Sequence, residues 1–235
     1  MPDIVGTSFS QMSLIRQKSS AVLVSFSGGK DSLVLLNLAQ QVFKKIECFF
    51  MYYVPGIEMV ENNIDAAEQR YGIKVHRVQH WAYYGAKKYG VYCSPNVNVQ
   101  LKRLGDVYEE IRARTGIVPI LTGAKRDDGQ WRRTNTETLG AGQYADVYTP
   151  IYEWTTYDVV GYCKMRGIQL PKSENKKNTG VDLSTKFVLW AYENDRQAYE
   201  KLKEEFPLLD AMVYREYWYN VTGKNVIREV HDTRA

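Results

Sequence analysis

Apolar and polar positions along the first third of the chain follow two different periods. The segments 21–26 and 46–54 are almost continuously apolar, and 73–78 alternates apolar and polar side chains, so these three segments predict strands. Between them, 31–44 and 58–71 place apolar residues at helical spacing. Strands that alternate with helices through short connections predict right-handed crossovers and a parallel sheet.

The alternation continues with two further predicted strands. After a segment at 80–97 that predicts a long loop, we expect a helix over 99–115, strands at 118–123 and 146–151, and a helix over 156–166. The expected fold class is therefore α/β. Its core would be a doubly wound, mostly parallel five-stranded sheet with helices on both faces.

The two ends of the chain predict additions to this sheet. Residues 1–19 form an N-terminal segment with a short helix expected over 11–18, and residues 20–170 form the α/β domain. Residues 171–235 are expected to form a loop and a helical C-terminal extension, interrupted at Pro207.

The composition limits the classes of protein that fit the chain. It has 235 residues, a net charge of +4 and 44% hydrophobic residues. No apolar run approaches the roughly 20 residues that span a bilayer, and the N-terminus lacks a charged and then apolar signal pattern. Cys48, Cys93 and Cys163 lack Cys-x-x-Cys spacing, so neither a disulfide framework nor an iron–sulfur cluster is expected. We expect a cytoplasmic protein with no membrane partner.

A run of small and polar residues, Ser-Gly-Gly-Lys-Asp-Ser at 27–32, follows the first predicted strand. Adjacent glycines let the backbone approach an anion, hydroxyl groups donate hydrogen bonds, and a helix N-terminus favours negative charge. The run therefore predicts a phosphate-binding loop, with a spacing different from that of a Walker A loop. A plain strand-to-helix turn capped by Asp31 or Ser32 is the alternative. The candidate phosphate-binding residues are Ser25, Ser27, Gly28, Gly29, Lys30, Asp31 and Ser32.

A second charged segment, at 123–133, follows the fourth predicted strand. Ligands of an open α/β sheet bind outside the carboxyl ends of strands, so this segment is expected at the same edge as 27–32. Its cations would neutralise phosphate or sulfate oxygens. A solvated loop in which Asp127 and Asp128 balance the cations is the alternative. The candidate ligand-binding residues are Gly123, Lys125, Arg126, Arg132 and Arg133.

The run at 27–32 resembles the PP-loop of the ATP pyrophosphatase and adenine nucleotide alpha-hydrolase superfamily. Residues 122–133 resemble the phosphoadenosine phosphosulfate (PAPS) reductase branch of that superfamily, with Lys125 in place of an arginine. The segment at 150–160 resembles the same branch, and its Thr155 would cap the following helix.

The turn after the second predicted strand also resembles this branch. Residues 54–61 keep the glycine and the glutamate of the reductase turn as Gly56 and Glu61, which adds these two to the candidate nucleotide-binding residues. The resemblance implies a Rossmann-like (HUP) domain that binds ATP, or else PAPS or adenosine phosphosulfate (APS), together with Mg²⁺.

One departure from the reductases affects the expected chemistry. Thiol-dependent reductases of this kind use a cysteine in a C-terminal Glu-Cys-Gly-x-His segment, and this sequence has no cysteine after Cys163. The first hypothesis is therefore an ATP pyrophosphatase-type enzyme, which adenylates an acceptor and releases pyrophosphate. Cations would stabilise the developing charge, and Asp31 would help to hold Mg²⁺. The candidate catalytic residues are Lys30, Asp31, Lys125 and Arg132, with Arg133 as the alternative to Arg132.

Two other hypotheses remain open. One is a PAPS- or APS-binding protein of the reductase type, acting through Cys93 or a partner's thiol. The other is a non-catalytic adaptor that senses a nucleotide. The acceptor of an adenylating enzyme would be a nucleic acid or a small molecule, and a protein partner or a second copy of the chain is also open.

Overall fold

A five-stranded sheet organises the first part of the chain. The computed structural model describes residues 3–128, 145–170 and 181–217. The strands lie in the order β3-β2-β1-β4-β5, and β1 pairs in parallel with both β2 and β4, as β4 does with β5. The strands are β1 (Ala21–Ser25), β2 (Lys45–Tyr52), β3 (Lys74–Gln79), β4 (Ile120–Leu121) and β5 (Val147–Tyr148).

The order of the strands reverses at β1. The chain adds β2 and β3 on one side of β1 and then returns to add β4 and β5 on the other side. In open α/β sheets such a reversal creates a crevice outside the carboxyl ends of the two central strands, and ligands bind there. The segments that follow β1 and β4 are the two that the sequence marks as candidate ligand-binding segments.

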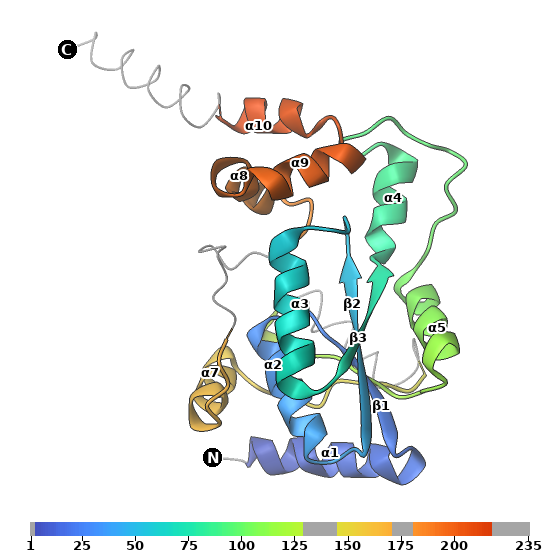
Figure 1. The fold of residues 1–235 in the computed structure, drawn as a ribbon. Helices are drawn as coiled ribbons and strands as arrows, with labels where there is room; N and C mark the ends of the chain where they lie inside the picture. Colours follow the sequence, from blue (N-terminus) through green and yellow to red (C-terminus); the bar gives the residue numbers. More distant parts are fainter. Residues whose placement is uncertain (1–2, 129–144, 171–180, 218–235) are drawn as a thin grey trace, which may run out of the picture. The chain divides into compact units, whose positions relative to one another are not determined.

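Helices cover both faces of this sheet (Figure 1). On one face, Tyr108 and Ile111 of α5 share a buried cluster with Leu23 of β1. On the other face lie α2 and α7, where Tyr162 of α7 donates a hydrogen bond of 2.9 Å to Asn37 of α2. The helices of this part are α1 (Ile4–Lys18), α2 (Lys30–Gln40), α3 (Glu58–Tyr71), α5 (Leu104–Thr115) and α7 (Thr156–Met165).

The predicted fold class is confirmed, whereas some predicted boundaries are wrong. The first helix begins at Ile4 and not at residue 11, because Asp3 caps it by accepting a hydrogen bond of 2.8 Å from the Gly6 N–H. The fifth strand is shorter than 146–151. Asp146, with a φ of +57°, interrupts the extended backbone before Val147, and a turn closed by the hydrogen bond of 3.0 Å from the Tyr152 N–H to the Thr149 carbonyl follows Tyr148.

The described residues form two compact units. The first comprises 3–51, 62–80, 103–128 and 145–170, and the second comprises 52–61, 81–102 and 181–217. None of the helices in the described part of the chain is long and apolar enough to cross a membrane. The division into 1–19, 20–170 and 171–235 stays a prediction.

The second unit is helical. Its core includes Phe187 and Trp190, whose rings stack at 5.8 Å, and the buried Tyr199 and Phe206. Helices were expected in the C-terminal part with a break at Pro207, and a second break occurs at Asp195, which caps α9. The helices of this unit are α4 (Trp81–Tyr89), α8 (Thr185–Asn194), α9 (Arg196–Glu205) and α10 (Leu209–Tyr217).

The helix α4 corrects the prediction of a long loop at 80–97. Two of its side chains bind a segment far along the chain: Tyr83 donates a hydrogen bond of 2.9 Å to the Glu205 carboxylate, and Lys87 Nζ lies 2.7 Å from it. Lys87 Nζ also lies 4.7 Å from the centre of the Phe206 ring. Tertiary contacts of this kind stabilise the helix, and its own periodicity does not reveal them.

Glu205→Gln is expected to lower the stability of the second unit by about 1 kcal/mol or less, because both partners are partly exposed. The hydrogen bond from Lys87 is the main cause that holds the pKa of Glu205 below its ordinary value. A lowered pKa means that the stabilisation is present above the ordinary pKa of 4.5 and is lost as the pH falls through the folded-state pKa. Thermal melts should therefore show a lower melting temperature for Glu205→Gln than for the unsubstituted protein at pH 7, and a smaller difference between the two at pH 3.

Glu204→Gln is the matched control for this prediction. Glu204 is the adjacent residue, and it pairs with Lys201 at an exposed position of the same helix. Its replacement should leave the melting temperature nearly unchanged at both pH values. An equal fall in melting temperature for Glu204→Gln and Glu205→Gln would contradict the role given to Glu205.

Candidate functional site

The segment between β1 and α2 is a tight loop with a glycine in the left-handed region. β1 ends at Ser25, and Gly28 has a φ of +72°. Gly29 is the N-cap residue of α2, and within the described residues no side chain caps this end of the helix. The structure therefore differs from the alternative of a turn capped by Asp31 or Ser32.

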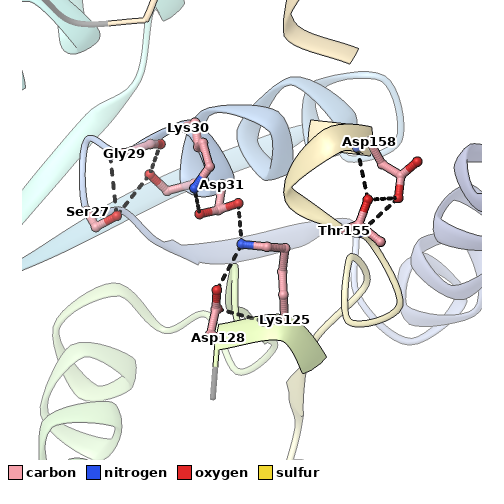
Figure 2. Close-up of polar contacts among 9 residues, drawn as sticks. Ser27, Gly29, Lys30, Asp31, Lys125, Asp128, Thr155 and Asp158 are labelled. Carbon is pink, nitrogen blue, oxygen red and sulfur yellow. Dashed lines mark hydrogen bonds and ion pairs between the residues drawn. The ribbon is translucent and has the colours of Figure 1, made fainter. Parts of the chain in front are cut away.

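Two serine hydroxyls cross-link this loop (Figure 2). Ser32 donates a hydrogen bond of 2.9 Å to the carbonyl of Gly29, and Ser27 donates one of 3.3 Å to Ser32 Oγ. The Gly29 N–H in turn donates to Ser27 Oγ at 3.4 Å. A helix N-terminus with hydroxyl groups beside it offers an anion several donors and a favourable dipole. The loop thus has the residue types that bind a phosphate group, and the two hydroxyls would have to turn from their partners within the loop to donate to one.

The end of β4 lies directly against the first turn of α2. A Cβ atom placed on Gly123 would come within 3.3 Å of the Asp31 carbonyl carbon and 3.4 Å of the Ser32 nitrogen. Lys125 reaches the same turn, with Nζ 2.6 Å from Asp31 Oδ1 and 3.0 Å from Asp128 Oδ1 (Figure 2). The structure therefore brings together the two candidate segments that sequence reasoning placed at one sheet edge.

Lys125 is a fully buried cation. Its side chain is 0% exposed, and both carboxylates that it contacts remain about a quarter exposed, at 24% for Asp31 and 27% for Asp128. Burial alone would lower the pKa of Lys125, but the hydrogen bonds to Asp31 and Asp128 and their negative charges outweigh it, so the pKa is raised. Lys125 therefore stays positively charged at neutral pH.

Lys30 is the more accessible lysine of the site. Its side chain is 33% exposed, and its Nζ lies 3.0 Å from Asp31 Oδ2. Each carboxylate oxygen of Asp31 thus accepts a hydrogen bond from a different lysine. Asp31 lies in the first turn of α2, where the helix dipole favours negative charge. We call Asp128, Lys125, Asp31 and Lys30 the charge chain, because the signs of their charges alternate.

The remaining predicted binding residues are distributed over three parts of the chain. Arg126 begins the short 3₁₀ helix η1 (Arg126–Asp128), and its guanidinium lies 3.1 Å from the Glu153 carboxylate at an exposed position. Gly56, with a φ of +74°, and Glu61 belong to the second unit. Arg132 and Arg133 lie outside the described residues.

Asp128 is a site residue that sequence reasoning did not assign. It was treated only as a charge that balances the neighbouring cations. In the structure its Oδ2 accepts a hydrogen bond of 2.9 Å from the Lys125 backbone N–H, while its Oδ1 binds the Lys125 ammonium group. The signal was the spacing of three residues between Lys125 and Asp128, which a 3₁₀ turn brings together.

The cysteines of the chain are buried. Burial raises the pKa of the Cys163 thiol, and the charge of Asp31 adds to this rise. Burial is also the main cause that raises the pKa of Cys48. Cys93, the candidate thiol for reduction, packs in the second unit with its Sγ 3.8 Å from the Ala86 carbonyl oxygen. Cys48 and Cys163 are therefore neutral thiols near pH 7.

A protein-only metal site is absent from the described residues. No group of three or more His, Cys, Asp or Glu side chains there is arranged to hold a metal ion. Both carboxylate oxygens of Asp31 accept from lysines, so a metal ion would have to displace one of them. The described residues alone do not fit Mg²⁺, and the assignment of Mg²⁺ to Asp31 stays a prediction.

A family comparison matches the part of the chain that carries this geometry. The family model of the phosphoadenosine phosphosulfate reductase domain matches residues 21–173, from the start of β1 to beyond α7. The chain belongs to the phosphoadenosine phosphosulfate reductase family. The resemblance to the PAPS reductase branch, predicted from residues 54–61, 122–133 and 150–160, is thereby confirmed.

One local detail of the PAPS reductase-like segment at 150–160 also agrees with its prediction. Thr155 caps α7 by accepting a hydrogen bond of 3.2 Å from the Asp158 N–H, and Asp158 accepts one of 2.8 Å from the Thr155 N–H (Figure 2). This reciprocal pair is a capping box, which fixes where the helix starts.

Two solved structures are similar to this member of the PAPS reductase family. The U34-tRNA thiolase NcsA from Methanococcus maripaludis, solved with its [4Fe-4S] cluster, is 16% identical with a TM-score of 0.47, over 88% of this chain and 80% of the thiolase. The NH₃-dependent NAD synthetase from Campylobacter jejuni subsp. jejuni NCTC 11168, solved in complex with the nitrate ion, is 14% identical with a TM-score of 0.49, over 92% of this chain and 93% of the synthetase. No curated protein matches the chain significantly.

The thiolase corrects the cofactor prediction. An iron–sulfur cluster was excluded from the spacing of the cysteines, yet NcsA, which is similar to this chain, carries a [4Fe-4S] cluster. The exclusion of an iron–sulfur cluster is therefore withdrawn.

Proposed function

We propose that this protein binds ATP at the loop formed by residues 27–32 and transfers the adenylyl group to an acceptor, with release of pyrophosphate. The observation that carries the proposal is the N-terminus of α2, which has no side-chain cap among the described residues and has the accessible ammonium group of Lys30 beside it. Phosphate groups require backbone and hydroxyl donors together with a cation. All of these lie in the loop at 27–32 and the first turn of α2.

The proposed reaction is a substitution at the α-phosphorus of ATP. An oxygen of the acceptor forms a bond to that phosphorus, and the bond from the phosphorus to the oxygen that bridges to the β-phosphorus breaks. The electron pair of the broken bond leaves with pyrophosphate. The loop backbone at Gly28 and Gly29 and the hydroxyls of Ser27 and Ser32 would hold the pyrophosphate, and Lys30 would stabilise its growing charge.

Two further groups have a supporting place in this proposal. Arg132 or Arg133 is predicted to add positive charge to the same site. Mg²⁺ that accompanies the phosphates would supply charge neutralisation. The acceptor is proposed to be a nucleic acid or a small molecule, in a cytoplasmic setting that agrees with the free thiols of the chain.

Thiol chemistry has less support than adenylation. Reduction of a sulfonucleotide needs a thiolate that reaches the sulfur atom. Burial raises the pKa of Cys48 and Cys163, and Cys93 is buried against the backbone of Ala86. The reacting oxygen of an adenylation comes from the acceptor, so that reaction needs no cysteine.

The decisive test is to incubate the purified protein with Mg²⁺ and ATP labelled at the α-phosphate. Candidate acceptors are total RNA, DNA oligonucleotides and a small-molecule extract, each added separately. We expect pyrophosphate and an acceptor that carries the labelled adenylyl group in at least one mixture, with free AMP where water or a second nucleophile then displaces it from the acceptor. Absence of pyrophosphate and of label on every acceptor, or formation of ADP instead, would contradict the proposal.

Lys30→Ala is expected to weaken ATP binding about fivefold, because a partly exposed charge contact contributes about 1 kcal/mol. Lys44→Ala is the matched control, since Lys44 is an exposed lysine that follows α2 at its other end. Calorimetry on both variants should show the loss only for Lys30. A loss of the same size for Lys44→Ala would indicate general charge attraction and contradict a specific role for Lys30.

The family match favours a second candidate, which is binding of PAPS or APS. Calorimetry with ATP, PAPS and APS, each displaced by the others, separates the two candidates. Preference for PAPS, together with reductase activity that Cys93→Ser abolishes, would replace adenylation by the reductase-type function. Binding of ATP without detectable binding of PAPS or APS would contradict the reductase-type function.

A further inference from the structure

Two residues of the charge chain, Lys125 and Asp128, are unsuited to bind a phosphate group directly. Lys125 is 0% exposed, and two of its three N–H donors point to carboxylates at 2.6 and 3.0 Å. A phosphate group would have to displace Asp31 or Asp128 to reach it. Asp128 carries a negative charge and would repel the same phosphate. Lys30, at the other end of the chain, is the accessible cation.

We propose that Lys125 and Asp128 are positioning residues: they fix Asp31, and Asp31 holds the Lys30 ammonium group beside the loop that receives the phosphates. The proposal rests on the proposed function, because the phosphates are those of the bound nucleotide. It gives Lys125 a different role from the one expected from sequence, which was to stabilise charge on the nucleotide directly.

The geometry around Asp31 supports this role. Each of its two carboxylate oxygens contacts a different ammonium group: Oδ1 lies 2.6 Å from Lys125 Nζ, and Oδ2 lies 3.0 Å from Lys30 Nζ. Gly123 keeps the end of β4 in contact with the same turn of α2, so the base from which Lys125 reaches Asp31 is itself fixed. A lysine side chain is long and flexible, and a fixed carboxylate partner restricts where its ammonium group lies.

Asp128 completes the arrangement through two contacts with a single residue. One oxygen accepts from the backbone N–H of Lys125 and the other binds its ammonium group, at 2.9 and 3.0 Å. The lysine is therefore clamped at both ends of its side chain. Loss of the Asp128 charge would loosen Lys125, and the effect would pass through Asp31 to Lys30.

A double-mutant cycle tests this transmission. The variants are Asp128→Asn, Lys30→Ala and the combination, and the measured quantity is the dissociation constant for ATP by calorimetry. Asp128→Asn alone should weaken binding about threefold. In the Lys30→Ala background it should have no further effect, because the residue through which it acts is gone. Asp127→Asn removes an equal charge from the same turn and should leave affinity unchanged.

Each outcome of the cycle has a defined meaning. Additive losses, or an effect of Asp127→Asn equal to that of Asp128→Asn, would overturn the positioning role while ATP binding itself stands. No binding of ATP by the unsubstituted protein would overturn the proposed function and this proposal with it. If Asp128→Asn does not fold, Lys125→Arg replaces it in the cycle. This variant alone should weaken ATP binding by less than about twofold, and it should have no effect in the Lys30→Ala background. Additive losses of ATP affinity in that second cycle would again overturn the positioning role.

Discussion

Gly28→Val is expected to weaken ATP binding by about five- to thirtyfold. Gly28 has a φ of +72°, and an L-residue pays about 1–2 kcal/mol to adopt this backbone conformation. The free loop can relieve the strain by changing its conformation, so the cost falls on the bound state, where a difference of about 1.4 kcal/mol is a factor of ten. A steric clash is not the cause, because a Cβ at Gly28 meets nothing within 4 Å.

Gly116→Val is the matched control for this prediction. Gly116 has a φ of +71°, and a Cβ atom placed on it would also meet nothing within 4 Å, but it is the C-cap residue of α5. The same strain should therefore appear as a lower melting temperature with an unchanged affinity for ATP. If Gly28→Val binds ATP as tightly as the unsubstituted protein, the loop is not the phosphate-binding element.

Local patterns in the sequence were sufficient to predict the fold and to place two candidate ligand-binding segments at one edge of the sheet. Continuous apolar runs identified β1 and β2, which pair in parallel, and the string at 27–32 follows β1 directly. The rule that ligands bind at the carboxyl ends of strands then placed Gly123 and Lys125 near this string. That step depended only on strand order, and the observed order has the reversal at β1 that the rule requires.

Details that depend on distant partners were beyond sequence reasoning. The helix α4 was expected to be a loop, because Tyr83 and Lys87 gain their partner, Glu205, only in the folded chain. Asp128 entered only the alternative interpretation of 123–133, as a solvated counter-charge, because the sequence does not show that Lys125 becomes fully buried. The role of a lysine therefore depends on its burial. A buried ammonium group needs fixed carboxylate partners, whereas an exposed one can also contact a ligand.

Lys125→Met is expected to destabilise the protein by about 2–3 kcal/mol and to lower its melting temperature by about 5–10 °C. Methionine can occupy the space of the lysine stem, so the loss comes from charge: Asp31 and Asp128 lose their common cation. Removal of one partner from a fully buried pair costs about 3–5 kcal/mol, and the partial exposure of both carboxylates reduces this figure. Lys164→Met, at an exposed position of α7, should have almost no effect.

The pH dependence separates this charge effect from a defect in packing. The pKa of Lys125 is raised in the folded protein, so its stabilising contribution is complete below the ordinary value of about 10.5 and is lost as the pH rises through the folded-state pKa. The gap in melting temperature between the unsubstituted protein and Lys125→Met should therefore be constant from pH 7 to about 9.5 and shrink above about 10.5. Adding Asp128→Asn to Lys125→Met should recover part of the loss at pH 7, because it removes one of the two negative charges that Lys125 had bridged. A gap that persists unchanged at high pH, with no recovery in the double variant, would show that packing and not charge explains the loss.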